Sequence, residues 1–115
     1  MRQKEIWLIN LDPTIGAEIK KTRPCVILND DSIGALPLKI IAPITDFKEK
    51  YKDVPWMIRL SPDKSNNLGK ASVIDVFQVR SVSEKRLIKR IGTINNDDLL
   101  KVKESLEIVF GIEKK

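Results

Sequence analysis

Residues 5–12 have the sequence Glu-Ile-Trp-Leu-Ile-Asn-Leu-Asp, a short apolar stretch that decides the fold class. Its apolar side chains include Ile6 and Leu11, and the turn-forming pair Asp12-Pro13 closes it. A stretch of this length with turn residues at its end is typical of a β-strand. Residues 5–12 therefore predict the first strand.

More stretches of this kind follow along the chain. They are short, apolar and bounded by turn residues, and they predict strands over residues 25–28, 38–44, 56–60, 72–80 and 90–94. Pro43 lies inside one of them. Because proline has no N–H to give to a neighbouring strand, residues 38–44 are expected at a sheet edge or at a bulge.

The C-terminal part has a helical period instead. Apolar residues recur at helical spacing at Leu99, Val102, Leu106 and Val109. Asn95 or Asn96 can cap the start of this helix, and Gly111 can end it. The whole pattern predicts one domain over residues 1–115 with a mainly β (α+β) fold, a small curved sheet or barrel of five to seven strands plus a C-terminal helix.

The chain is basic, with 21 Lys and Arg against 16 Asp and Glu and a net charge of +5. A positive excess favours polyanionic partners such as RNA or DNA, although a solvated basic surface is also common. The first residues carry charges of both signs, and no apolar run approaches the length that spans a membrane. We therefore expect a cytoplasmic protein without a signal peptide or membrane segment.

Several kinds of site are excluded by residue counts. The chain has no histidine and one cysteine, Cys25, so the usual zinc sites and the Ser-His-Asp and Cys-His arrangements cannot form. No glycine-rich phosphate-binding loop is present. The adjacent acidic pairs 30–31 and 97–98 do not suit magnesium, so we expect no metal and no cofactor. Cys25 lies in an apolar run and is interpreted as a core residue.

A polar and basic group remains near the second predicted strand: Glu18, Lys20, Lys21, Thr22 and Arg23. Arg23 precedes Pro24, which holds it in an extended conformation at the entrance of a strand. Thr45 lies at the end of another strand. Taken alone, an arginine at such a place more often forms a surface ion pair, and such a threonine is more often a turn residue.

The order of these pieces resembles the MazF/PemK family of toxins. The resemblance rests on residues 5–16, on Glu18, on the run from Arg23-Pro24 to residue 30, on residues 41–45 and on residues 72–82, and it covers nearly the whole chain. It implies an SH3-like barrel that works as a homodimer. It also implies a toxin that cleaves single-stranded mRNA at specific sequences without a metal ion, that inhibits translation and growth, and that a cognate antitoxin inhibits.

The resemblance also assigns residues. The family's catalytic arginine falls on Arg23 and its catalytic threonine on Thr45, while Glu18 matches an acidic loop position and is a candidate base. Attack by the 2′-hydroxyl of the RNA would give 2′,3′-cyclic phosphate and 5′-hydroxyl ends. A guanidinium can bind two phosphate oxygens at once and stabilise the charge that develops there. We expect RNA contacts from Lys20, Lys21, Thr22 and Gln78, and an acidic, partly disordered antitoxin.

The chain departs from the family pattern at three places. Ala17 and Ile19 flank the loop glutamate where many relatives have serine and glutamine. Phe77 stands where some relatives have an acidic residue just before the glutamine, here Gln78, and Asp75 lies two residues earlier. A mechanism that depends on that acid is therefore in question.

Two other functions fit the same fold class. One is a toxin similar to CcdB, which binds DNA gyrase and needs no reactive arginine. The other is an SH3-like adaptor module, but the low aromatic content of 5% does not suit a proline-binding groove. Arg23 together with Thr45 favours RNA cleavage.

Overall fold

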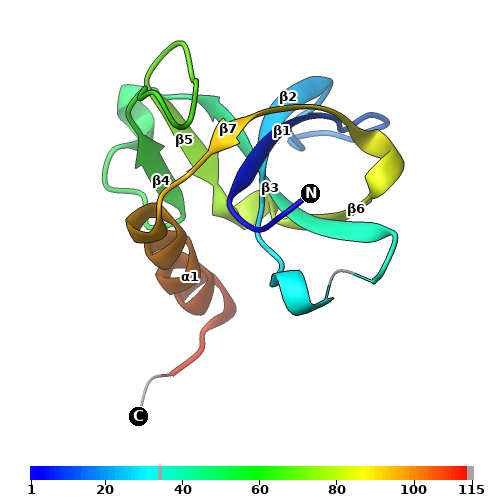
Figure 1. Cartoon of the computed structure of the whole chain (residues 1–115). Coiled ribbons are helices and arrows are strands. Elements are labelled where there is room, and N and C mark those ends of the chain that lie inside the picture. Colours follow the sequence, from blue (N-terminus) through cyan, green and yellow to red (C-terminus); the bar gives the residue numbers. More distant parts are fainter. Residues whose placement is uncertain (34, 114–115) are drawn as a thin grey trace.

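The computed structural model describes residues 1–33 and 35–113. Its strands and single α-helix are β1 (Glu5–Asn10), β2 (Thr22–Ile27), β3 (Leu38–Asp46), β4 (Met57–Leu60), β5 (Ser72–Asp75), β6 (Arg80–Ser83), β7 (Leu87–Thr93) and α1 (Asn96–Phe110). Short 3₁₀ turns lie at Asp31–Ile33, Glu49–Tyr51, Val76–Gln78 and Glu84–Arg86. The mainly β fold with a C-terminal helix is confirmed (Figure 1).

The strands form one antiparallel sheet in the order β4-β5-β3-β2-β1-β7, and β6 pairs with β3 as well. β1 and β2 pair with Ile6 opposite Val26, and β2 and β3 pair with Cys25 opposite Pro43. Figure 1 shows the sheet curling round, with α1 packed at one end. Because strands far apart in sequence come together in this curl, residues of the first loop can meet residues near position 78.

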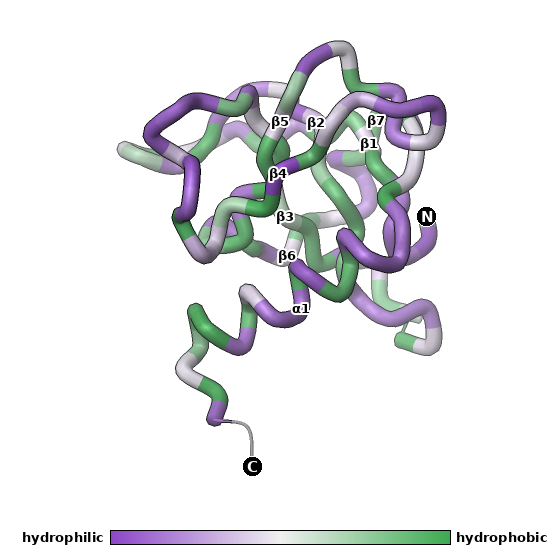
Figure 2. Tube along the Cα trace, turned by 90° about the vertical axis from the view of Figure 1, so that its left-hand side faces the viewer, coloured by the Kyte–Doolittle hydropathy of each residue, from purple (hydrophilic) through white to green (hydrophobic). Residues whose placement is uncertain are grey.

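Apolar side chains fill both faces of the central strands. One cluster, which includes Ile6, Val26 and Ala42, packs against Leu99 and Val102 of α1. The other lies on the opposite face and contains Ile9, Leu11, Cys25, Ile27, Ile41 and Val82. Alternate residues of a strand point to opposite faces, so the successive apolar residues Cys25, Val26 and Ile27 of β2 serve both clusters. Figure 2 shows these strands as hydrophobic and the loops between them as largely hydrophilic.

Helix α1 begins and ends as its sequence predicts. The Asn95 side chain accepts a hydrogen bond from the Asp98 backbone N–H over 2.8 Å, a cap worth about 1 kcal/mol. Gly111 ends the helix with a left-handed φ of 67°. The cap is therefore Asn95 rather than Asn96.

The prediction of one strand over residues 72–80 was wrong. The Asp75 carboxylate accepts the Phe77 N–H over 3.2 Å, and the chain turns at Val76–Gln78 before β6 starts. The turn lets the chain change its place along β3, since β5 pairs with residues 44–46 and β6 with residues 38–41. A local side-chain to backbone bond thus overrides an apolar strand pattern.

The expectation that residues 38–44 form an edge or bulged strand was also wrong. β3 lies in the middle of the sheet and pairs with β2 on one side and with β6 and β5 on the other. Pro43 falls between the β6 pairing, which ends at Ile41, and the β5 pairing, which starts at Ile44. The missing N–H therefore costs no bond in either pairing, which explains a proline in a central strand.

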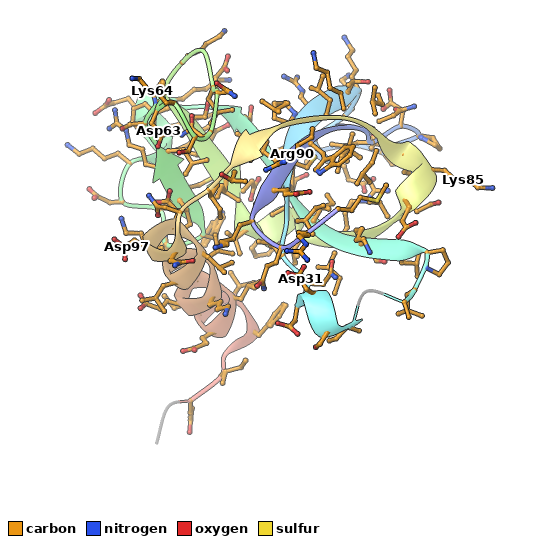
Figure 3. The ribbon with its side chains drawn as sticks, viewed as in Figure 1. Asp31, Asp63, Lys64, Lys85, Arg90 and Asp97 are labelled. Atoms are coloured by element: carbon orange, nitrogen blue, oxygen red, sulfur yellow. The ribbon has the colours of Figure 1, made fainter. Side chains whose placement is uncertain are left out.

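Charged side chains lie at the outside of this curled sheet. Figure 3 shows Lys85 pointing into solvent at the corner between β6 and β7. In the described part of the chain, no helix has the length and apolar content that crossing a membrane requires. Cys25 is fully buried, and burial raises the pKa of its thiol to about 12, which confirms its interpretation as a core residue.

Candidate active site

Arg23 and Thr45 lie on neighbouring strands, β2 and β3. The pairing of β2 with β3 runs from Ile27–Ile41 to Cys25–Pro43, so Arg23 and Thr45 each lie two residues beyond its last pair, at the same end of the two strands. Arg23 also pairs with Ile9 of β1, and Thr45 with Val73 of β5. Because alternate residues share a face, both side chains project on the side of the sheet that carries Ile9 and Cys25. The two residues singled out in the sequence are thus brought together by the sheet.

The charge of Arg23 is not neutralised by a carboxylate. Its side chain is half-buried, and Nε donates a hydrogen bond to the Lys20 carbonyl over 3.3 Å. No described carboxylate forms an ion pair with it; the ion pairs of residues 1–33 and 35–113 involve other groups. A guanidinium that is oriented by one backbone bond keeps its remaining N–H groups for an anion.

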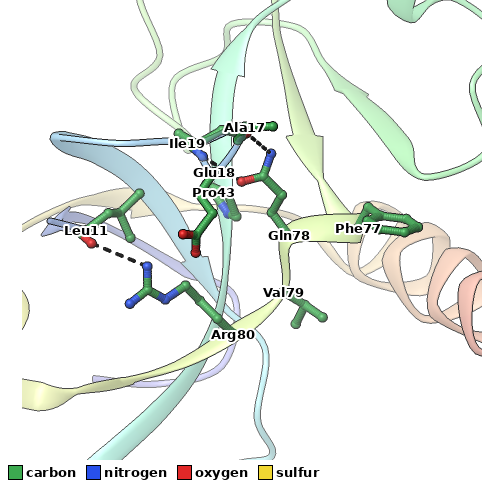
Figure 4. A pocket seen from close by; sticks show the side chains of 9 residues that line it. All are labelled: Leu11, Ala17, Glu18, Ile19, Pro43, Phe77, Gln78, Val79 and Arg80. Atoms are coloured by element: carbon green, nitrogen blue, oxygen red, sulfur yellow. Dashed lines mark hydrogen bonds between the residues drawn. The ribbon is translucent and has the colours of Figure 1, made fainter. Parts of the chain in front are cut away.

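A cavity of about 390 Å³ lies between the first loop, β3 and the Val76–Gln78 turn. It is lined by Leu11, Ala17, Glu18, Ile19, Pro43, Phe77, Gln78, Val79 and Arg80 (Figure 4). Pro43 precedes Thr45 by two residues on the same face of β3, so the cavity shares this face of the strand with Thr45. Neither Arg23 nor Thr45 lines the cavity, and neither do Lys20, Lys21 and Thr22.

Glu18 brings a carboxylate to the cavity. The side chain is exposed, and its Oε1 accepts the Ile15 backbone N–H over 2.7 Å. Figure 4 shows the Glu18 carboxylate pointing between the side chains of Gln78 and Arg80. This places a proton acceptor in the cavity, as the chemistry of a general base requires.

Gln78 holds the loop that carries Glu18. Its Oε1 accepts the Ile19 N–H over 2.6 Å, and its Nε2 donates to the Ala17 carbonyl over 3.5 Å and to the Asp75 carboxylate over 3.0 Å. The two loop bonds lie on either side of Glu18. Gln78 therefore joins the loop to the Val76–Gln78 turn, and its polar atoms are engaged within the protein.

Asp75 accepts a hydrogen bond from the Gln78 side chain and so fixes the bonds between Gln78 and the loop. Its side chain is buried, and burial raises the pKa of the carboxyl above its usual range although the bonds from Gln78 and Phe77 act in the opposite direction. The buried Asp75 carboxylate thus contacts Gln78 directly. Asp75 does not line the cavity.

Five cations surround the loop, and we call them the basic rim: Lys20, Lys21, Arg23, Arg80 and Arg86. Arg80 donates to the Leu11 carbonyl over 3.3 Å, and Arg86 donates to the carbonyls of Asn10 and Asp12. The backbone of Lys21 bonds Leu11 and the Asp12 carboxylate, which lowers the pKa of Asp12. The rim gathers positive charge at one end of the sheet, as binding of a phosphodiester chain requires.

Arg80 and Arg86 were missed as site residues in the sequence. Both guanidinium groups donate hydrogen bonds to backbone carbonyls about seventy positions earlier in the chain. The residue types near position 80 do not predict such long-range bonds. No three described side chains of the types His, Cys, Asp or Glu converge to hold a metal ion. The site supplies the guanidinium and ammonium cations of the basic rim, the Thr45 hydroxyl and the carboxylates of Glu18 and Asp75. These groups suit charge stabilisation and proton transfer at a phosphate.

The fold and the site together define a small, basic protein with a curled antiparallel sheet of seven strands and one C-terminal helix. The model of the PemK-like, MazF-like toxins of type II toxin–antitoxin systems matches residues 2–110, so the chain belongs to this family. It is 31% identical to the "Endoribonuclease MazF" of Staphylococcus epidermidis over 113 residues, with 97% of this chain and 92% of that protein covered. It is 28% identical to "Endoribonuclease MazF9" of Mycobacterium tuberculosis, with 94% of each chain covered.

Solved structures show the same fold. MazF from Deinococcus radiodurans superposes with a TM-score of 0.79 at 23% identity, and 97% of each chain is covered. A mycobacterial endoribonuclease in complex with its cognate antitoxin also has a TM-score of 0.79, at 12% identity and with 100% of this chain and 99% of that chain covered. These findings confirm the family resemblance and give no support to the gyrase-binding alternative.

Proposed function

We propose that this protein is the toxin of a type II toxin–antitoxin system and a metal-independent endoribonuclease that cleaves single-stranded mRNA. The observation that supports the proposal best is that Arg23, which has no ion pair with a described carboxylate, and Thr45 lie at the same end of β2 and β3, and that Glu18 lines a cavity together with Pro43 of β3. Two family relatives over nearly the whole chain are named endoribonucleases. No cofactor takes part.

The reaction is an internal transfer at one phosphate. The 2′-oxygen of a ribose forms a bond to phosphorus, the bond from phosphorus to the 5′-oxygen of the next nucleotide breaks, and the products are a 2′,3′-cyclic phosphate and a 5′-hydroxyl. Arg23 binds the phosphate oxygens, where negative charge builds up, through two parallel N–H donors. Thr45 positions the phosphate or the 2′-hydroxyl by a hydrogen bond. Its hydroxyl hardly ionises near neutral pH and therefore does not serve as a base.

Proton transfer is assigned to Glu18. Its carboxylate takes the proton of the 2′-hydroxyl. A water molecule donates a proton to the departing 5′-oxygen. The anchoring of the loop through Gln78 supports this role, because a general base must be held within hydrogen-bond reach of the proton that it takes.

RNA binding is assigned to the exposed residues Lys20, Lys21 and Thr22 and to Gln78. The lysines neutralise backbone phosphates, and Arg80 and Arg86 extend the same positive surface. Gln78 can reach a base only by sharing the bonds that it already makes to Asp75 and Ile19. Its larger effect on cleavage therefore comes through the position of Glu18.

We assign two protein partners, a second copy of the chain and an acidic antitoxin that covers the basic rim. An apolar groove between β3, β6 and α1, lined by residues such as Ile40, Leu106 and Phe110, is a suitable face for the second copy. Ile40 and Phe110 are exposed there.

One domain of this kind, acting on mRNA in the cytoplasm, would stop translation and growth.

The experiment incubates the purified protein with a long defined single-stranded RNA in excess EDTA and maps the product ends. Discrete cuts that carry 2′,3′-cyclic phosphate support the proposal, and light scattering gives the mass that tests the dimer. Absence of cutting by the folded protein, together with stable binding to DNA gyrase, would overturn it in favour of the gyrase-binding function.

A further inference from the structure

Phe77 is an exposed aromatic residue at the rim of the cavity. Its side chain is 62% exposed, and it lines the cavity on the side away from Leu11 (Figure 4). Its backbone is fixed, because the Phe77 N–H bonds the buried Asp75 carboxylate over 3.2 Å and the neighbouring Val76 is fully buried. The ring thus stands on a hydrogen-bonded turn between β5 and β6 rather than on a loose loop.

One part of the ring is supported by Trp56. The two ring centroids lie 5.5 Å apart with an interplanar angle of 57°, a tilted arrangement that is favourable for aromatic pairs. Trp56 packs against the core cluster on the α1 side of the sheet. Trp56 therefore limits the positions of the Phe77 ring and leaves the rest of its surface to solvent.

The surroundings of the ring match the chemistry of an unpaired nucleobase. A base offers flat faces for stacking and polar edges for hydrogen bonds, and single-stranded RNA is bound by this combination in general. Across the cavity from Phe77 stand the Glu18 carboxylate, which accepts hydrogen bonds, and the Arg80 guanidinium, which donates them. The positive charge of the basic rim beside them suits the phosphates of the same strand.

We propose that Phe77 is the stacking platform of a nucleobase subsite, and that a base next to the cleaved phosphate stacks on its ring while the base edge faces Arg80. The proposal rests on the RNA-cleaving function and adds a position at which the enzyme selects its substrate. Stacking tolerates every base, so the ring supplies affinity and register, and the edge contacts supply the preference.

The experiment compares Phe77→Ala, Phe77→Leu and Phe77→Tyr with the wild type. Leucine keeps an apolar side chain but has no flat face, whereas tyrosine keeps the face. The matched control is Leu100→Ala, since Leu100 is 55% exposed on α1 and lines none of the cavities described above. The probe is an oligonucleotide that contains the mapped cut site with a 2′-deoxynucleotide at the cleaved position, so that binding is measured without cleavage.

We expect the alanine and leucine variants to bind this probe about 5- to 150-fold more weakly, while tyrosine stays within about twofold of the wild type. In a set of probes with one abasic position each, one position should remove the difference between wild type and Phe77→Ala. The inference is overturned if Phe77→Leu binds the probe as well as the wild type does. It is also overturned if no abasic position removes the difference between wild type and Phe77→Ala. A change in the mass in solution on substitution would instead assign Phe77 to a protein contact. A wild type that neither cuts nor binds RNA refutes the proposed function itself.

Discussion

The Gln78 side-chain amide donates a hydrogen bond to the buried Asp75 carboxylate over 3.0 Å, and the same amide accepts the Ile19 N–H over 2.6 Å. The loop residue Ile19 is therefore tied to a carboxylate that lies beneath the Val76–Gln78 turn. This connection decides how firmly the neighbouring Glu18 is held.

Gln78→Glu should loosen this loop and slow RNA cleavage. A glutamate cannot donate to Asp75 or to the Ala17 carbonyl, and its charge repels the Asp75 carboxylate. Hydrogen exchange of the Ile19 amide is expected to become about tenfold faster, as the loss of one net hydrogen bond would cause. Unchanged exchange at Ile19, with slower cleavage, would assign Gln78 to RNA contact instead of loop positioning.

Arg23→Lys should lower the rate of cleavage by about 10²- to 10³-fold although it keeps the charge. Lysine offers a point charge without the two parallel donors of a guanidinium. The rate constant is measured on a short RNA under single-turnover conditions. Arg90→Lys is the control, because Arg90 on β7 forms an ion pair with Glu5 over 3.5 Å and does not line the cavity. Equal rates for Arg23→Lys and the wild type would remove Arg23 from the mechanism.

Asp75 predicts a pH-dependent stability. Its pKa is raised above the usual 3.8 by burial, so the folded state prefers the protonated form. The contribution of Asp75 is then most favourable below pH 3.8 and is lost as the pH rises through the raised pKa. The free energy of unfolding of the wild type minus that of Asp75→Asn should therefore fall between about pH 3 and pH 7 in urea titrations. A difference that rises with pH would show that the hydrogen bonds to Asp75 outweigh its burial.

Gly92→Ala should destabilise the fold by about 1–3 kcal/mol, because an added methyl group has no room. A Cβ at Gly92 would lie 2.3 Å from the backbone oxygen of Ser65. Gly69→Ala is the control, since a Cβ there meets nothing within 4 Å. Thermal unfolding of the two variants should separate them clearly, and equal melting temperatures would contradict the close packing of β7 on the Ser65 loop.

The sequence was sufficient for most of the strand series and for the capped helix, because apolar runs and an Asn cap are local features. Arg23 and Thr45 were assigned through the family resemblance, since an arginine before a proline and a threonine at a strand end are not specific on their own. The break after Asp75 was not predictable in the same way, because Val76 and Phe77 continue an apolar pattern and the turn depends on a carboxylate that bonds its own backbone neighbour.

The rest of the site depends on contacts between distant segments. Gln78 was expected to contact RNA, and its bonds to Ala17 and Ile19 appear only once the sheet curls. Arg80 and Arg86 reach backbone carbonyls of residues 10–12, and a carbonyl is present at every position of a sequence. A pattern of residue types therefore gives no sign of these contacts.

The most direct test of the central claim, cleavage by the RNA's own 2′-hydroxyl at the Arg23–Thr45 pair, is mass spectrometry of a short RNA cut in EDTA. Two substrates are compared, the RNA that spans the mapped cut site and the same RNA with a single 2′-deoxynucleotide at the cleaved position. We predict a 2′,3′-cyclic phosphate and a 5′-hydroxyl from the first, and no product from the second or from either substrate with Thr45→Ala. Cleavage of the deoxy substrate, or a 5′-phosphate on the product, would contradict the account.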